Sequence, residues 1–411
     1  MRLHFLKTIF YNCIKILAFC LKKTQSVFII PEETGVHEPY SITNYTGDNV
    51  LAFLYYLINN HDSPDLFCKQ IYIVALNSMI ESECKRLQSK LKYIKLIPIA
   101  YPQKKKKNFI QYFIYHFCMG RCRIIINPSD VEPLHVKARW QLSICLNYFS
   151  APFKSDILKH RMAVQHQTID YVIAASDFSV RMDLCASNLS YFNYSVLGFI
   201  RQDILLNPRF KRVDIESWLG ITPMNRIIVY APTHRDGKLH KQHSAIIGCE
   251  NLKLLNTILS RCSTILLIKP HSGMLDDQFL GLDDCSNIMI YEPSPRYTFY
   301  DILPHADLLI TDYSSIYFDF LVTGKPVVFN FCDRVEYEKN RGLSYNPVEL
   351  FCAGKIVYTE EELYTVIEDE LNGKTYKNDK HYNDVRRLFI KYEDGKTCER
   401  VYDFICEKIA E

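Results

Sequence analysis

Short apolar runs alternate with longer segments of helical spacing along most of the chain. In its first half, runs rich in β-branched and aromatic residues predict strands at 27–30, 71–76, 94–97, 123–126, 142–146, 171–174 and 194–197. Between these runs, apolar residues three or four positions apart predict helices at 49–59, 78–91, 108–117, 156–165 and 179–185. Strands that alternate with helices build parallel sheets, so the pattern predicts an α/β fold.

A second series of the same kind follows a polar stretch at 201–209 that contains Pro208. Its strands are predicted at 227–230, 264–268, 288–291, 308–310 and 327–329, and its helices at 252–260, 315–321 and 360–371. Two further helices, at 384–390 and 398–409, have no following strand and either cap the second series or cross back to the first. We therefore expect two Rossmann-like domains facing each other across a cleft, which resembles the GT-B architecture. The first would occupy 24–204, and the second would occupy 205–411 and carry the terminal helices.

Residues 1–23 form a separate apolar segment. It is interrupted by Lys7 and Lys15, so it is too short and too charged for a membrane span of about 20 apolar residues. As a helix, it would place on one face Leu6, Ile9, Phe10, Cys13, Ile14, Leu17 and Leu21. Such a helix suits peripheral attachment at the cytoplasmic face of a membrane, and the run Lys104–Lys107 could add contact with anionic lipid. The ordinary alternatives are a first helix packed on its domain and a solvated lysine loop.

The amino-acid composition of the chain argues against some classes of function. The chain has 411 residues, of which 48% are apolar and 23% charged, enough for a full core in each domain. Its 49 basic and 46 acidic residues give a net charge of +3, which argues against a nucleic-acid partner. Fifteen cysteines are scattered without a C-x-x-C pair, which favours reduced core thiols in a cytoplasmic protein over a disulfide or metal framework.

Polar residues follow three predicted strands of the second domain. These are Thr233, His234 and Arg235 after the first, Lys269 and His271 after the second, and Thr311, Asp312, Tyr313, Ser314 and Ser315 after the third. Ligands of open α/β sheets bind at the carboxyl ends of the strands, and the serine pair would begin a helix whose free N–H groups favour phosphate. Each residue alone has an ordinary explanation, such as a helix cap or a loop histidine. Together they predict one phosphate site.

The same segments carry a resemblance to a known family. Residues 229–236, 268–271 and 306–315, followed by Asp319, Phe320 and 324–327, resemble the CDP-glycerol:poly(glycerophosphate) glycerophosphotransferase family. That family includes teichoic acid primases and polymerases and related capsule polymerases. Upstream, Gly198–Asp203 resembles the family's Gly-x-x-Arg-x-Asp junction, and Gly47–Asn49 resembles its early Asp-Asn pair.

The resemblance implies a GT-B transferase that moves glycerol phosphate, or another polyol phosphate, from a CDP-activated donor to an acceptor hydroxyl and releases CMP. No cofactor or metal is expected. By this resemblance, the catalytic residues are His271, Ser314 and Ser315, which hold the donor diphosphate. The other donor-side residues would be Thr233, His234, Arg235, Lys269, Thr311, Asp312, Tyr313, Asp319 and Arg201. The acceptor side would comprise Asp48, Asn49, Lys154, His160 and His166.

One departure from the family concerns the acceptor side. The family carries a His-Gly pair where this chain reads Tyr148-Phe149-Ser150-Ala151-Pro152-Phe153-Lys154, so Phe149 replaces the expected general base. Either another group such as His160 or His166 takes the proton, or the enzyme is slower, differently specific or inactive. A polyol-phosphate or glycosylated acceptor is therefore expected. Two alternatives stay open: a GT-B glycosyltransferase that uses a CMP-sugar or other nucleotide-sugar, and a nucleotide-binding subunit that is catalytically silent.

Overall fold

The computed structural model describes most of the chain. The described residues are 2–21, 24–31, 49–63, 66–75, 78–101, 108–128, 134, 136–146, 168–185, 189–223, 225–233, 251–270, 282, 284–292, 297–375 and 379–411. Within them, the side chains of residues 2–8, 78 and 79 are not described. The predicted helix at 156–165 lies outside the described residues.

The first domain is a parallel sheet of seven strands with the order β3-β2-β1-β4-β5-β6-β7. Its strands are β1 (Thr24–Ile29), β2 (Gln70–Ala75), β3 (Lys95–Ala100), β4 (Cys122–Asn127), β5 (Leu142–Cys145), β6 (Tyr171–Ala174) and β7 (Tyr194–Val196). The helices between them are α2 (Asn49–Asn60), α3 (Ser78–Gln88), α4 (Phe109–Arg121) and α6 (Asp177–Leu184). The sheet therefore changes direction between β1 and β4, as in a Rossmann domain.

The second domain repeats this topology with six parallel strands in the order β10-β9-β8-β11-β12-β13. Its strands are β8 (Arg226–Ala231), β9 (Thr264–Ile268), β10 (Ile288–Ile290), β11 (Leu308–Thr311), β12 (Val327–Asn330) and β13 (Lys355–Val357). Its helices are α8 (Arg212–Leu219), α9 (Leu252–Arg261), α10 (Phe299–Ile302), α11 (Ile316–Phe320), α12 (Arg334–Asn340) and α13 (Glu360–Leu371). Here the change of direction falls between β8 and β11.

Two sheets of this topology confirm the predicted α/β fold of GT-B type. All twelve predicted strands are present, and β13 is a further strand that the apolar pattern did not indicate. The pattern also missed α7 (Ile200–Leu206), α8, α10 and α12. The stretch at 201–209, interpreted as a polar boundary, begins as the helix α7, so the predicted division at 204/205 falls inside a helix.

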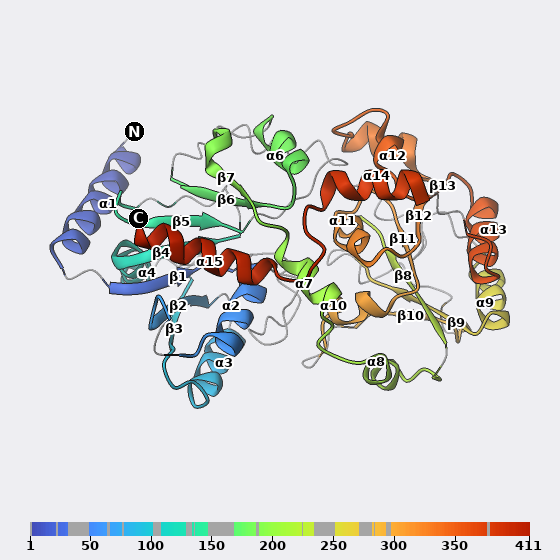
Figure 1. The fold of residues 1–411 in the computed structure, drawn as a ribbon, viewed down its shortest axis with the longest axis horizontal. Helices are drawn as coiled ribbons and strands as arrows, with labels where there is room; N and C mark the ends of the chain where they lie inside the picture. Colours follow the sequence, from blue (N-terminus) through green and yellow to red (C-terminus); the bar gives the residue numbers. More distant parts are fainter. Residues whose placement is uncertain are drawn as a thin grey trace.

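The C-terminal helices join the two domains. Figure 1 shows α7 between the lobes and α15 (Thr397–Ala410) lying along the first one, after α14 (Asp379–Phe389) on the second. Cys398, Val401 and Ile405 of α15 are buried in the apolar core of the first domain. The last helix therefore crosses back to the first domain, which is one of the two predicted alternatives. The division predicted from the sequence had assigned this helix to the second domain.

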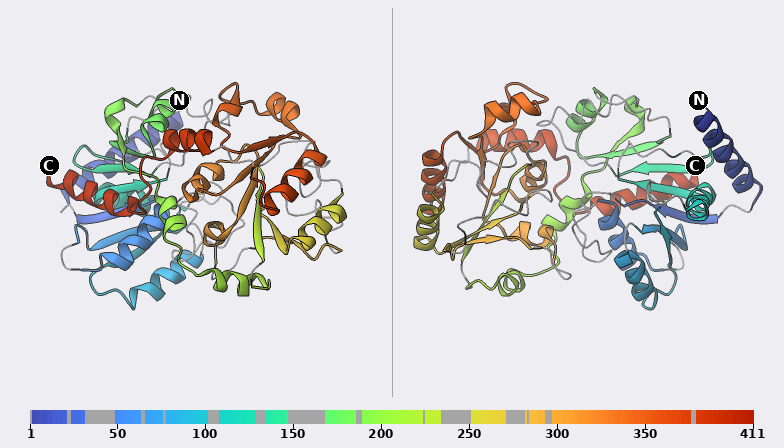
Figure 2. Two further views of the ribbon diagram at one scale, coloured as in Figure 1. Left: turned by 45° about the vertical axis from the view of Figure 1, so that its right-hand side comes forward. Right: turned by 180° about the vertical axis from the view of Figure 1, so that it is seen from behind.

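Helix α1 (Arg2–Cys20) lies at the outer edge of the first domain (Figure 2). It packs on α4 through Ile14 and Ala18, which are 1% and 2% exposed. The helices approach closely because Gly120 has no side chain, since a Cβ there would lie 3.3 Å from the Cβ of Ala18. Within the described residues, no helix is long and apolar enough to span a membrane.

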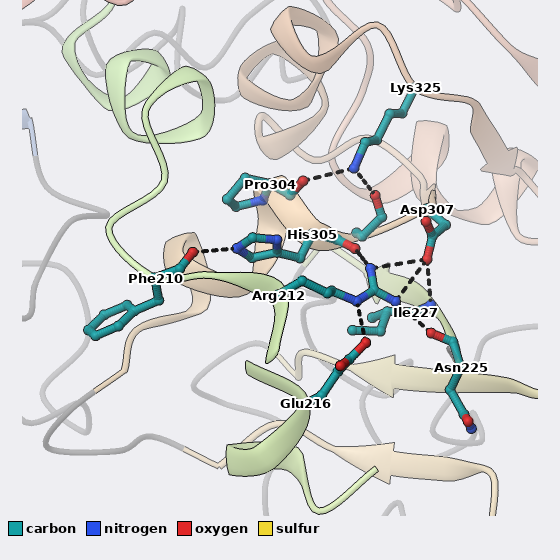
Figure 3. A network of polar contacts seen from close by, with 10 residues as sticks. Phe210, Arg212, Glu216, Asn225, Ile227, Pro304, His305, Asp307 and Lys325 are labelled. Carbon is teal, nitrogen blue, oxygen red and sulfur yellow. Dashed lines mark hydrogen bonds and ion pairs between the residues drawn. The ribbon is translucent and has the colours of Figure 1, made fainter. Parts of the chain in front are cut away.

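A polar network stabilises the amino-terminal edge of the second sheet (Figure 3). Arg212 forms ion pairs with Glu216 and Asp307 and donates to the carbonyl oxygens of Asn225 and His305. The Asp307 carboxylate also accepts from the backbone N–H of Ile227, at the start of β8, at 2.8 Å. The network therefore fixes the sheet at the edge opposite to the predicted site.

Candidate functional site

The three polar segments predicted from the sequence follow neighbouring strands. β9, β8 and β11 are adjacent in the second sheet, where Tyr230 pairs with Ile268 and Ala231 pairs with Thr311. Lys269, Thr233 and the turn at 311–315 consequently leave the sheet at the same carboxyl edge. They do so at the point where the strand order reverses, which is where open α/β sheets bind ligands.

Thr233 is hydrogen-bonded to Asp312 at this edge. The Thr233 backbone N–H donates to both carboxylate oxygens, at 2.9 and 3.0 Å, and its hydroxyl donates to Oδ1 at 2.7 Å. Asp312 is fully buried and Thr233 is 2% exposed. The carboxylate thus fixes the chain at the end of β8, directly before His234 and Arg235 in the sequence.

Two other residues of the turn face the interior. The Thr311 hydroxyl donates to the carbonyl oxygen of Ala231 at 2.9 Å and closes the gap between β8 and β11. The Tyr313 ring is fully buried and stacks on Tyr337 and Phe331, with ring centroids 3.8 and 4.8 Å apart. Tyr313, predicted to bind substrate, therefore contributes its side chain to the core and can offer a ligand its backbone alone.

The serine pair stands where the turn enters α11. Ser314 is half-buried, Ser315 is 5% exposed, and their carbonyl oxygens accept from the N–H groups of Tyr317 and Phe318. Ser315 occupies the N-cap position, but its hydroxyl makes no capping bond to the five residues of α11. The predicted helix is confirmed, but it is too short to supply much of the dipole expected of it. In the predicted phosphate site, hydroxyl and backbone donors would therefore be the main anion-binding groups.

Lys269 continues β9 at the same edge. Its backbone N–H donates to the carbonyl oxygen of Tyr230 at 2.8 Å, which prolongs the pairing of the two strands. Its Nζ lies 5.4 Å from the centre of the Phe299 ring, a cation–π contact with α10. The residue as a whole is half-buried.

Arg201 and Asp319, both predicted to bind the donor, contact each other. Their side chains are 4% and 1% exposed, and Nη2 of Arg201 lies 3.2 Å from Oδ2 of Asp319. The Tyr300 hydroxyl donates to the same oxygen at 2.6 Å, and the guanidinium packs over the rings of Phe199 and Tyr300. Burial raises the pKa of the Asp319 carboxyl, while Arg201 and the Tyr300 hydroxyl oppose that rise.

On the acceptor side, the structure describes Asn49 of the predicted residues. Asn49 is 5% exposed at the first turn of α2, and its amide donates to the carbonyl oxygen of Leu146 at 3.3 Å. Its Oδ1 accepts from the backbone N–H of Arg201 at 3.2 Å. Leu146 is the last described residue before the segment that contains Phe149. Asn49 therefore links the carboxyl edge of the first sheet to the domain junction.

The remaining predicted site residues lie outside the described residues, so their predicted parts in the site stay predictions. They are His271, His234, Arg235, Asp48, Lys154, His160 and His166, together with Phe149. His271 follows Pro270 directly after the edge of β9, and His234 follows Thr233.

Sequence reasoning missed Tyr300, whose hydroxyl reaches Asp319 from α10. The sequence does carry a local signal there, because Thr298 and Asp301 form a capping box that begins α10. That signal predicts a helix start. It does not indicate which buried group the following tyrosine contacts.

Several known proteins that are similar to this chain are teichoic acid enzymes. Residues 77–407 match the sequence profile of the family described as CDP-Glycerol:Poly(glycerophosphate) glycerophosphotransferase. The teichoic acid ribitol-phosphate primase of Bacillus spizizenii is 25% identical over 322 residues, which cover 72% of this chain and 78% of that protein. The teichoic acid glycerol-phosphate primase of Bacillus subtilis is 30% identical over 185 residues, 44% of this chain and 43% of that protein.

Among solved structures, the wall teichoic acid polymerase TagF has a TM-score of 0.69 to this chain at 18% identity. The alignment covers 100% of this chain and 97% of that one. At this level of identity, the structural similarity shows a shared fold.

Proposed function

Because this chain belongs to the CDP-glycerol:poly(glycerophosphate) glycerophosphotransferase family, and is thus a transferase, we propose that it transfers a polyol phosphate from a CDP-activated polyol. The acceptor hydroxyl attacks the phosphorus that carries the polyol. The bond from that phosphorus to the bridging oxygen breaks, and CMP leaves with the electron pair. Relatives named for ribitol phosphate and for glycerol phosphate make either polyol a candidate for a teichoic acid or capsule polymer.

The adjacency of three strand ends is the observation that supports this proposal most. Lys269, Thr233 and the 311–315 turn converge at the switch point of the second sheet, where a donor diphosphate would meet an ammonium, hydroxyls and backbone N–H groups. Phosphoryl transfer needs mainly alignment and neutralisation of charge, and these groups can supply both. His271 and Arg235, which follow two of these strands in the sequence, would complete the set.

The donor can be identified by measuring CMP release from CDP-glycerol, CDP-ribitol and CMP-sialic acid with polyol-phosphate and glycosylated acceptors. We expect release from at least one CDP-polyol. Release from the CMP-sugar alone would instead establish the nucleotide-sugar alternative. Binding of CDP without turnover of any donor would establish the silent subunit that Phe149 makes conceivable.

The phosphate site itself is tested by Ser315→Ala and His271→Ala. Removing one donor to a developing charge costs about 2.7–4 kcal/mol of transition-state stabilisation, or about 10²–10³ in turnover. We expect CMP release to fall by that factor while the melting temperature changes little. Turnover like that of the wild type in both variants would refute the assignment.

The general base is tested by restoring the family's residue. Phe149→His should raise transfer to a simple polyol-phosphate acceptor, because a positioned base contributes about 10²–10⁴ in rate. Unchanged activity on every acceptor would mean that Phe149 does not occupy the base position. His160→Ala and His166→Ala, in the wild-type background, then show whether either histidine takes the proton.

We also propose that the protein attaches to the cytoplasmic face of a membrane through α1 and α4. Apolar side chains on these neighbouring helices are exposed, with Ile16 at 66%, Phe19 at 67%, and Phe109 and Ile110 at 68% each. Lys15 lies on α1, and the run Lys104–Lys107 precedes α4 in the sequence. Lysines near anionic lipid contribute about 1 kcal/mol each, so apolar insertion and charge would act together.

A further inference from the structure

The start of α7 lies between the two sites of the proposed reaction. Asn49 connects the backbone of Arg201 to Leu146, at the carboxyl edge of the first sheet. The Arg201 side chain forms an ion pair with Asp319 on α11, which directly follows the 311–315 turn of the second domain. Beside it, the amide of Gln202 donates to the carbonyl oxygen of Phe318 at 3.1 Å. A continuous set of polar contacts therefore joins the acceptor edge to the donor turn.

The rest of the Gly198–Asp203 segment fixes α7 from the other side. Gly198 has a φ of +110°, and a Cβ there would lie 2.6 Å from Oγ1 of Thr397, so α15 approaches the backbone too closely for any side chain. Asp203 accepts from the backbone N–H groups of Thr397 and Cys398 at 3.0 and 2.8 Å. Gly198 and Asp203 thus hold this segment against α15, whereas Arg201 holds it against α11.

The chemistry of the Arg201–Asp319 ion pair indicates that it orients the groups it joins rather than adds to the stability of the fold. Arg201 and Asp319 are at most 4% exposed, so neither presents a surface to a nucleotide. A buried pair loses its hydration, and apolar residues of equal volume are often as stable or more so. The pair instead fixes the orientation of the Arg201 side chain, because the planar guanidinium packs over two aromatic rings and pairs with one carboxylate.

We propose that Arg201 and Asp319 are positioning residues that hold the 311–315 turn of the second domain at a fixed distance from the acceptor edge of the first. The proposal concerns the relation between the domains. Its catalytic consequence rests on the proposed function, since transfer requires donor and acceptor to align, whereas binding of CDP requires the second domain alone. A misplacement of about 1 Å can cost about 10²-fold in rate.

The test replaces the pair with apolar residues of similar volume, Arg201→Met with Asp319→Leu, so that no buried charge is left alone. Spin-labelled amino acids, inserted genetically because the chain has fifteen cysteines, replace Lys85 on α3 and Lys253 on α9. Both side chains are well exposed, at 72% and 75%. We expect the distance distribution between the labels to broaden or shift in the double variant. Leu259→Ala, a cavity in the second core, is the control that lowers stability without touching the junction.

The catalytic arm measures CMP release and CDP binding in the same variants. We expect turnover to fall by about 10²-fold in the double variant while the Kd for CDP stays within about threefold, and Arg201→Lys to retain part of the turnover. An unchanged distance distribution with unchanged turnover would overturn the proposal. So would loss of CDP binding with an unchanged distribution, because the two residues would then contact the donor. If the wild type turns over no CDP-polyol, the proposed function fails, and the distance measurement still decides the positioning proposal.

Discussion

Asp312 accepts three hydrogen bonds from one residue, Thr233, and this limits what either side chain can do. Both are buried, so their contribution to a ligand site is to hold the end of β8 against the end of β11. An aspartate that the motif suggests as a ligand contact thus fixes the end of a strand next to the predicted contacts.

Thr233→Val keeps the shape of the side chain and removes its hydroxyl donor. A hydrogen bond to a charged group contributes about 1.5–3 kcal/mol, so we expect the free energy of unfolding to fall by that amount. CMP release should fall as well, because the end of β8, which directly precedes the predicted donor residues His234 and Arg235 in the sequence, loses part of its anchor. Urea unfolding and the CMP assay measure the two effects. Thr233→Ser, which keeps the hydroxyl, should behave as the wild type, and a valine variant of full stability would argue against the anchor.

At this scale, the sequence predicted which residues gather but not which way their side chains point. The strand-end rule brought Thr233, Lys269 and the serine pair to one edge because parallel strands share a carboxyl edge. It could not indicate that Tyr313 stacks on Tyr337 or that Arg201 reaches Asp319. Those directions depend on partners far away in the chain, which a local pattern does not contain.

Elements with a continuous apolar run or a clear periodicity were predicted well. β6, β9 and α13 have the predicted bounds, because each combines a strong pattern with turn or capping residues at its ends. β13 was missed because it has three residues, of which Val357 alone is buried. α7 was missed because buried polar residues, among them Arg201 and Gln202, hide the helical periodicity.

The η3 turn (Leu303–His305) between α10 and β11 carries a prediction about pH. Burial, with Arg212 and Lys325 nearby, lowers the pKa of His305 from its ordinary 6.5, although the Phe210 carbonyl and Asp301 act against this. Below pH 6.5, His305 of the unfolded chain binds a proton that His305 of the folded protein does not bind. Stability should therefore fall as the pH drops below 6.5 and onward through the lowered pKa.

His305→Gln keeps a donor for the Phe210 carbonyl and removes the titration, so it should flatten this part of the profile. Urea unfolding at about pH 5 and about pH 8 gives the comparison. A variant with the same slope as the wild type would assign the acid sensitivity to other groups.

For the whole molecule, the membrane proposal requires a test that leaves the fold intact. Removing residues 1–23 would uncover the partners of Ile14 and Ala18 in the core, so substitutions on the exposed side of α1 are sharper. Ile16→Glu with Phe19→Glu should release the protein from vesicles that contain anionic lipid, because two charges replace the inserted apolar groups. Co-sedimentation at low and high salt measures this, and high salt should weaken binding of the wild type.

Val335→Glu on α12 is the matched control, since Val335 is 84% exposed on the second domain. It should bind vesicles as the wild type does. Equal loss of vesicle binding in the α1 double variant and in Val335→Glu would mean that added negative charge, and not the exposed face of α1, governs attachment. A wild type that stays in the supernatant at low salt would exclude the proposal.

The return of α15 to the first domain has a consequence for how the protein is made. Val401 and Ile405 are fully buried in the first core, and Asp203 meets Cys398 across 195 residues of chain. The first domain therefore leaves the ribosome with part of its apolar surface uncovered. That surface stays uncovered until the entire second domain has been synthesised. Such a nascent chain is exposed to misassembly for that whole interval and is a natural client for chaperones. A premature stop shortly before residue 397 would accordingly cause a folding defect in the domain that was translated first.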